Sequence, residues 1–162
     1  MKTRNWLVSA ALVTALLAAL AVAPWRAAAS PPEMGSGSYV VTGADVTDVR
    51  VGDDGTIFIT ETEYADATGT LARSFAHDLI VAIHRDGSLT FHGKGTFTGT
   101  VDGVSGSFED VIEGQGSLIT LELHGSFTIT SGSGGLKGLQ GHATIDGIPA
   151  TGGTYTIQFH FE

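Results

Sequence analysis

The sequence SLTFHGKGTFTGTV, residues 88–101, alternates between two kinds of residue at every step. Positions of one parity are all apolar or glycine, and positions of the other parity are all polar. Successive side chains of a β-strand point to opposite faces, so this period of two predicts a strand with one buried face. A helix would repeat its apolar residues every three or four positions, and this stretch does not.

The same alternation recurs along most of the chain after its first 38 residues. It predicts about eight antiparallel strands, at residues 38–46, 56–64, 71–84, 88–101, 104–113, 117–130, 142–147 and 154–161. Several of these stretches exceed ten residues and carry glycines on the inward face, which is typical of a strongly coiled sheet. We therefore expect an all-β fold, a single antiparallel closed barrel of about eight strands, with a β-sandwich as the alternative.

Turn residues set the register of three neighbouring strands. A three-residue loop Arg85-Asp86-Gly87, with Gly87 in the left-handed conformation, turns the apolar residues of strand 71–84 inward, whereas a two-residue loop would turn them to solvent. A two-residue turn at Asp102-Gly103 continues this register into the next strand. The three strands then place one row of aromatic side chains in the interior: Phe75, Phe97 and Phe108.

Polar residues also point inward in this register. His77 lies opposite Gly95, which lies opposite Asp110, and Arg73 lies one row further on, opposite Gly99. Because glycines leave room above the sheet, the interior could hold a ligand, and the candidate pocket consists of Arg73, His77, Asp110, Phe75, Phe97 and Phe108.

Two further readings of the interior stay open at this point. Glu61 and Glu63 share the parity of Ile57 and Ile59 and are weaker additions to the pocket. Alternatively, His77 and Asp110 form a buried structural hydrogen bond that closes one barrel end.

Residues 1–29 have the three parts of a secretory signal peptide. A basic start, Met1-Lys2-Thr3-Arg4, precedes an apolar run over residues 7–22, and Ala27-Ala28-Ala29 supplies the small residues of a cleavage site. A transmembrane anchor is the alternative, but the apolar run would span only about 24 Å as a helix, short of a ~30 Å hydrocarbon core.

We therefore expect cleavage after Ala29 and a secreted or extracytoplasmic protein. Residues 30–38, rich in proline, glycine and serine, are predicted to be a flexible linker, and residues 39–162 to be the β-barrel domain. The mature part keeps all 17 acidic residues but only five basic ones, a net charge of −12. Such a charge disfavours nucleic acid and anionic membrane as partners.

Few residues have the spacing of a catalytic or metal site. Five of the six histidines fall on the outward parity of their strands and form no closely spaced pair, so we expect neither a metal nor a cofactor. The outward histidines are His84, His92, His124, His142 and His160. No serine-nucleophile motif, cysteine or phosphate-binding loop is present in the sequence.

Two stretches resemble a known group of barrels. The glycine-rich segment Gly132–Gly141 (GSGGLKGLQG) is similar to one in allene oxide cyclases and dirigent proteins, and residues 84–108 resemble a bacterial family of uncharacterised barrels related to the cyclases. The resemblance implies an eight-stranded barrel with an internal cavity, and it carries no catalytic residue to this chain. Read from its residues, the glycine-rich segment is a tight connection that packs Leu136 and Leu139 under the barrel.

Three functions are consistent with these features. The first is binding of a small amphipathic or apolar ligand in the barrel interior. The second is a structural or interaction protein with a filled core. The third is a cyclase- or isomerase-like enzyme in which His77 or Asp110 carries a proton.

Overall fold

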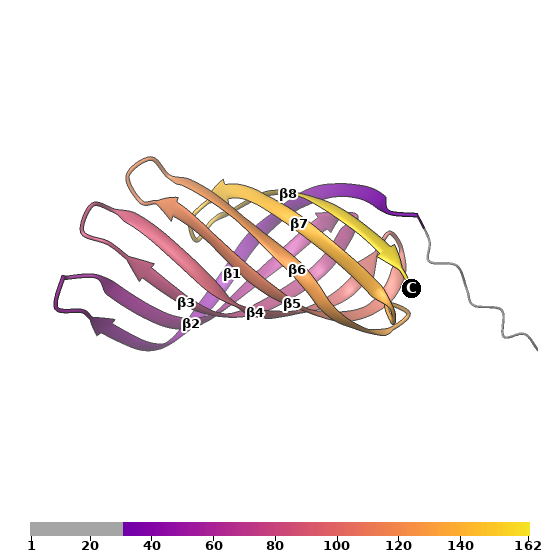
Figure 1. Ribbon diagram of the computed structural model, residues 1–162, viewed down its shortest axis with the longest axis horizontal. Helices are drawn as coiled ribbons and strands as arrows, with labels where there is room; N and C mark the ends of the chain where they lie inside the picture. The colour runs from indigo at the N-terminus through magenta and orange to yellow at the C-terminus, as the bar shows by residue number, and fades with distance from the viewer. Residues whose placement is uncertain (1–30) are drawn as a thin grey trace, which may run out of the picture.

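Eight antiparallel strands close into a barrel in the computed structural model, which describes residues 31–162 (Figure 1). Each strand pairs with its neighbours in sequence, and β1 pairs with β8 to close the ring. This confirms the predicted all-β closed barrel over the sandwich. The strands are β1 (Glu33–Val51), β2 (Ile57–Gly69), β3 (Leu71–Ile83), β4 (Ser88–Val101), β5 (Val104–Ser117), β6 (Glu122–Gly134), β7 (Leu139–Ile148) and β8 (Gly152–Phe161).

The register predicted for β3, β4 and β5 is confirmed. The amide of His84 donates to the carbonyl of Ser88 at 2.9 Å across the three-residue loop, and Gly87 has a φ of 80°. At the next turn Asp102 and Gly103 both have positive φ, as a two-residue hairpin requires. The paired rows therefore run as expected, Phe75 beside Phe97 and Phe97 beside Phe108.

The first strand begins earlier than predicted. Residues 33–38, expected to belong to a flexible linker, pair with β8 and form the start of β1. The glycines there serve close packing, because a Cβ on Gly37 would collide with the Tyr155 ring and one on Gly35 with the Thr70 side chain. Residues 33–38 thus have the glycine and serine content typical of a linker, but they form a strand whose glycines pack closely against larger side chains.

The predicted strand 117–130 is wrong at its start. Residues 118–121 form the turn between β5 and β6, and its apolar side chains are exposed, Ile119 by 73%. Leu121 has a φ of 59°, which ends the extended conformation. The alternation of apolar residues continues through this turn although the strand does not.

Apolar side chains fill the barrel at one end. Towards the β2–β3, β4–β5 and β6–β7 turns, the apolar side chains with no exposed surface include Leu71, Val101, Leu136 and Ile157. Leu139 is also buried, so the glycine-rich segment packs two leucines under the barrel as predicted. Phe97 and Phe108 stack above them with ring centroids 4.7 Å apart. This end is a solid core.

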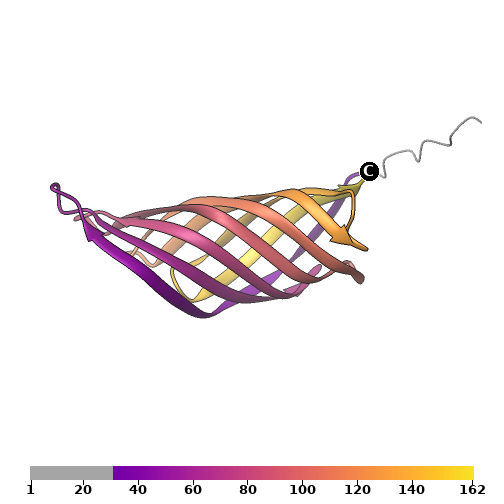
Figure 2. The same ribbon diagram turned by 90° about the horizontal axis from the view of Figure 1, so that it is seen from below.

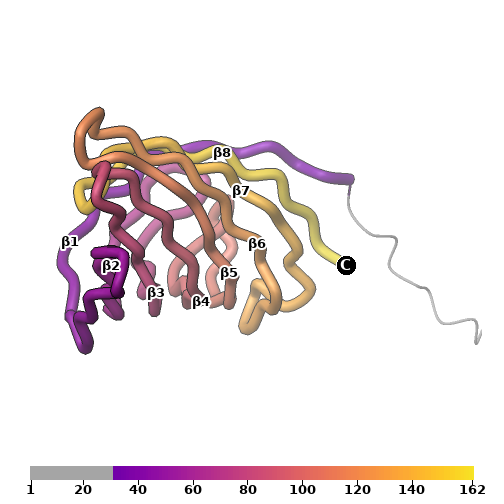
Figure 3. Tube along the Cα trace, turned by 60° about the vertical axis from the view of Figure 1, so that its left-hand side comes forward, coloured from indigo at the N-terminus to yellow at the C-terminus, as the bar shows by residue number. Residues whose placement is uncertain are grey.

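The opposite end carries the β1–β2, β3–β4, β5–β6 and β7–β8 turns. The strands wind obliquely around the barrel, and the β1–β2 hairpin projects furthest from this end (Figure 2). β1 pairs with β8 only over Glu33–Val40, so among the described residues its later half has β2 as its one strand partner (Figure 3). No helix in residues 31–162 is long and apolar enough to cross a bilayer.

A candidate ligand cavity

A cavity of about 240 Å³ occupies the half of the barrel that the core leaves unfilled. It extends to the β5–β6 and β7–β8 turns, where the lining residues Leu118 and Ile148 are partly exposed to solvent. Most of its wall is apolar, and includes Leu79, Leu89, Phe91, Ile112, Leu123, Phe127 and Ile145. An apolar molecule bound against this wall would be removed from water, which is favourable.

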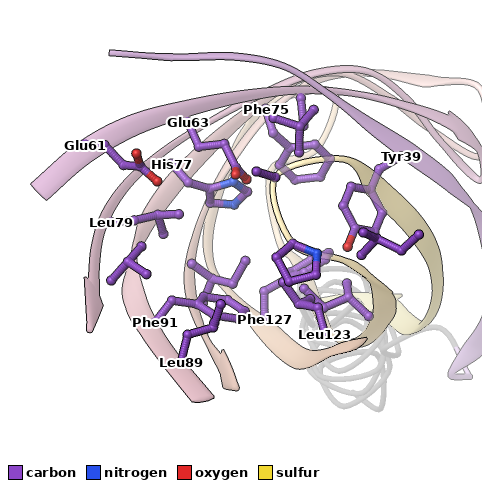
Figure 4. A pocket seen from close by; sticks show the side chains of 18 of the residues that line it. Tyr39, Glu61, Glu63, Phe75, His77, Leu79, Leu89, Phe91, Leu123 and Phe127 are labelled. Carbon is purple, nitrogen blue, oxygen red and sulfur yellow. The ribbon is translucent and has the colours of Figure 1, made fainter. Parts of the chain in front are cut away.

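Five polar side chains interrupt this wall, and the hydroxyl of one of them, Tyr155, is hydrogen-bonded to backbone groups. Of the other four, Tyr39 comes from β1, Glu61 and Glu63 from β2, and His77 from β3. Glu61 and Glu63 are two positions apart on one strand and so face the same side, and Glu63 pairs directly with His77 across β2 and β3. Figure 4 shows Glu61, Glu63 and His77 together on one side of the cavity, with Leu89 and Phe91 below them.

Burial changes the acidity of these groups. It raises the pKa of Glu61 and, with the neighbouring Glu61 charge, the pKa of Glu63, while His77 acts on Glu63 in the opposite direction. Burial and the Glu63 charge raise the pKa of Tyr39 to about 12. Glu63 is therefore electrostatically coupled to Glu61, His77 and Tyr39.

His77 and Asp110 meet as the register predicted. The Nε2 atom of His77 lies 3.2 Å from Oδ1 of Asp110, and the two side chains are 8% and 0% exposed. The contact has the distance of an ion pair without the geometry of a hydrogen bond, so these atoms and Oδ2 of Asp110 have no hydrogen-bond partner within residues 31–162. Such atoms are rare in folded proteins and are often functional.

Neighbouring groups hold the His77 ring in place. The ring stacks on Phe75 with centroids 5.2 Å apart and planes 13° from parallel. The ring also lies against Gly95, where any Cβ would collide with its Cδ2 and Nε2 atoms. One edge of His77 thus reaches the cavity while Nε2 faces Asp110, which lies behind the cavity wall.

Arg73 does not belong to the site. It pairs with Gly99 as predicted, but its side chain is exposed and its φ is 114°, so the alternation of faces breaks at this residue. The space over Gly99 is taken by the Phe97 ring, which a Cβ on Gly99 would approach to 2.8 Å. A guanidinium among these apolar side chains would have no partner, which is costly.

The three phenylalanines divide between core and cavity. Phe75 lines the cavity, whereas Phe97 and Phe108 lie in the solid core beyond it. The two glutamates receive little weight from the sequence alone, although their parity is the available signal. Tyr39 is not among the residues predicted for the pocket, although it lies in the predicted strand 38–46, because no turn fixes the register of that strand against its neighbours.

The outward histidines lie where the sequence placed them. Four are exposed and His160 is half-buried, and no group of three metal-binding side chains occurs in the described part of the chain. His124 contacts the exposed Asp146, with Nδ1 and Oδ1 2.6 Å apart, on the outer surface. An exposed pair of this kind contributes little to stability.

The chain belongs to the DUF3224 family, described as proteins of unknown function, whose model matches residues 35–161. A solved structure from this family, a protein with unknown function from Shewanella oneidensis MR-1, superimposes with a TM-score of 0.67. The two sequences are 20% identical, and the match covers 82% of this chain and 99% of that one, a likeness that shows the fold. No curated protein matches the sequence.

Proposed function

We propose that this DUF3224 protein binds a small amphipathic or apolar molecule inside its barrel. The observation that carries the proposal is the division of the interior into a solid core and a cavity of about 240 Å³ that reaches the turn-bearing end. An interior that served only as a core would be filled from end to end, as protein interiors are close-packed. An apolar wall with a few grouped polar side chains is typical of small-molecule sites.

A second candidate function is favoured by the buried His77–Asp110 contact. A histidine that faces a cavity with a carboxylate behind it is an arrangement suited to proton transfer. A cyclase- or isomerase-like reaction on the bound molecule would use it, and a relation to allene oxide cyclases is part of this second proposal. The binding proposal holds with or without catalysis.

Binding can be tested with a pair of variants on β3. Val81 lines the cavity, and its neighbour Ile80 points outward and is 38% exposed. Val81→Trp should fill the cavity and weaken the binding of N-phenylnaphthylamine, a neutral fluorescent probe, by about tenfold or more. Ile80→Trp adds the same side chain outside and should leave the affinity unchanged. Equal affinities for both variants, or no probe binding to the wild type, would refute the proposal.

We also infer that the protein acts outside the cytoplasm, from the signal-peptide pattern of residues 1–29, which lie outside the described residues. Intact-mass measurement of the exported protein should give a chain that begins at or within a residue or two of Ser30. A retained N-terminal segment would contradict this inference.

A further inference from the structure

We infer that the cavity selects a cationic amphiphile, a molecule with an amine head and an apolar body. The inference rests on the proposed binding function and names its ligand class. The head would lie between Glu61, Glu63 and Tyr39, and the body would follow the apolar wall past Leu79 and Phe91.

The first support is an excess of negative groups without a compensating cation. Glu61 and Glu63 both line the cavity, and neither carboxylate has a hydrogen-bond or ion-pair partner among residues 31–162. None of the lysine and arginine side chains of that range lines the cavity. They lie elsewhere: Arg50 packs over the Phe58 ring, and Arg73, Arg85, Lys94 and Lys137 are exposed.

The second support is the unpartnered pair beside these carboxylates. His77 is the one cavity-lining side chain that could become cationic, and its Nε2 faces the buried Asp110. Any positive charge on that ring would therefore be shared with Asp110, so it cannot fully offset Glu63. A ligand carboxylate would meet Glu61 and Glu63 in the cavity, with Asp110 behind the wall, whereas an ammonium group would be attracted by all three.

The third support is the arrangement of polar and apolar groups. Glu61, Glu63 and His77 lie on one side of the cavity, while Leu89, Phe91, Phe127 and Leu123 line the part below them (Figure 4). Tyr39 faces the same space with its hydroxyl, which can donate to a ligand oxygen or accept from an ammonium group. A molecule with one polar end and one apolar end matches this division.

The test compares three ligands that differ only in the head group: decylamine, decanol and decanoate. Each displaces N-phenylnaphthylamine from the wild-type protein at neutral pH, below the concentration at which it forms micelles. We expect decylamine to bind about tenfold or more tightly than decanoate, with decanol between them. Decanoate binding as tightly as decylamine would overturn the inference while leaving the proposed binding function intact.

Variants assign the preference to the cavity. Glu63→Gln should lower the affinity for decylamine more than the affinity for decanol and so reduce the advantage of decylamine, and Glu61→Gln gives a second test if the first variant folds poorly. Glu113→Gln is the matched control, because Glu113 is exposed on β5 and its substitution removes the same charge outside the barrel. An equal effect of Glu113→Gln would show general charge attraction and overturn the inference. Failure of the probe and all three ligands to bind would instead refute the proposed function itself.

Discussion

At the scale of single residues, His77 and Asp110 are unusual because both are buried and their contact is not a hydrogen bond. The two side chains are not equivalent partners. Removing His77 leaves a carboxylate with no neighbouring group to compensate its charge, whereas removing the Asp110 charge leaves a histidine that can be neutral. Burial of an unpaired charge costs far more than burial of a neutral imidazole.

This asymmetry predicts the outcome of a double-mutant cycle. His77→Phe should lower the free energy of unfolding by about 1–3 kcal/mol, and Asp110→Asn by clearly less. In the presence of Asp110→Asn, the cost of His77→Phe should shrink, because no buried charge is left unpaired. Urea unfolding of the four proteins measures all three values. Strictly additive changes would mean that the two side chains do not interact in the folded state.

At the scale of strands, Gly95 is the position where β4 passes between His77 and Asp110. A Cβ there would collide with the His77 ring and come within 2.9 Å of Oδ1 of Asp110. The next residue, Thr96, is exposed on the outer face.

Two substitutions on β4 should therefore differ sharply. Gly95→Val forces the His77–Asp110 contact apart, and overpacking of this kind typically costs ~1–3 kcal/mol. Thr96→Val places a good strand former on the outside and should change stability little. Thermal unfolding compares them directly. If both variants shifted the melting temperature equally, the inward and outward faces of β4 would be misassigned.

Some of the strand pairing could be predicted from the sequence, and some strand features could not. Aspartate–glycine turns have few conformations, so Asp102-Gly103 and the loop at Gly87 determined how β3, β4 and β5 pair, and with them the meeting of His77 and Asp110. The inward direction predicted for the Arg73 side chain is wrong because the positive φ of this residue interrupts the alternation of faces. The neighbouring residues give no signal from which this positive φ could be predicted. Residues 33–38 were misread because glycine serves both loose linkers and tightly covered strands.

At the scale of the whole molecule, the barrel is a solid core joined to a hollow end. The core is apolar apart from the hydrogen-bonded Tyr155 hydroxyl and Asp110 at its border, and the burial of its side chains stabilises the fold. The hollow end carries Glu61 and Glu63, whose ionised forms are disfavoured by burial. Groups that oppose folding in this way are often kept for function.

That division makes the stability of the barrel depend on pH through Glu63. Because the folded-state pKa of Glu63 is raised, protonation favours the folded state, and stability is lost as the pH rises from the ordinary glutamate pKa through the raised one. The exposed Asp54 and Asp86, whose pKa values are lowered by hydrogen bonds from Thr56 and Ser88, act in the opposite direction, so the wild-type profile alone does not isolate Glu63.

The contribution of Glu63 can be isolated by comparing the free energy of unfolding of the wild type with that of Glu63→Gln. Glutamine has nearly the same shape and never ionises, so the variant should be more stable than wild type at neutral pH, with the difference vanishing below the ordinary glutamate pKa of about 4.3. Urea unfolding at a series of pH values measures this difference, and Glu113→Gln, on the outer surface, should show none of it. A Glu63→Gln variant less stable than wild type at neutral pH would mean that the ionised carboxylate has a favourable partner in the cavity. The polar wall would then be part of the fold rather than a place kept for a ligand.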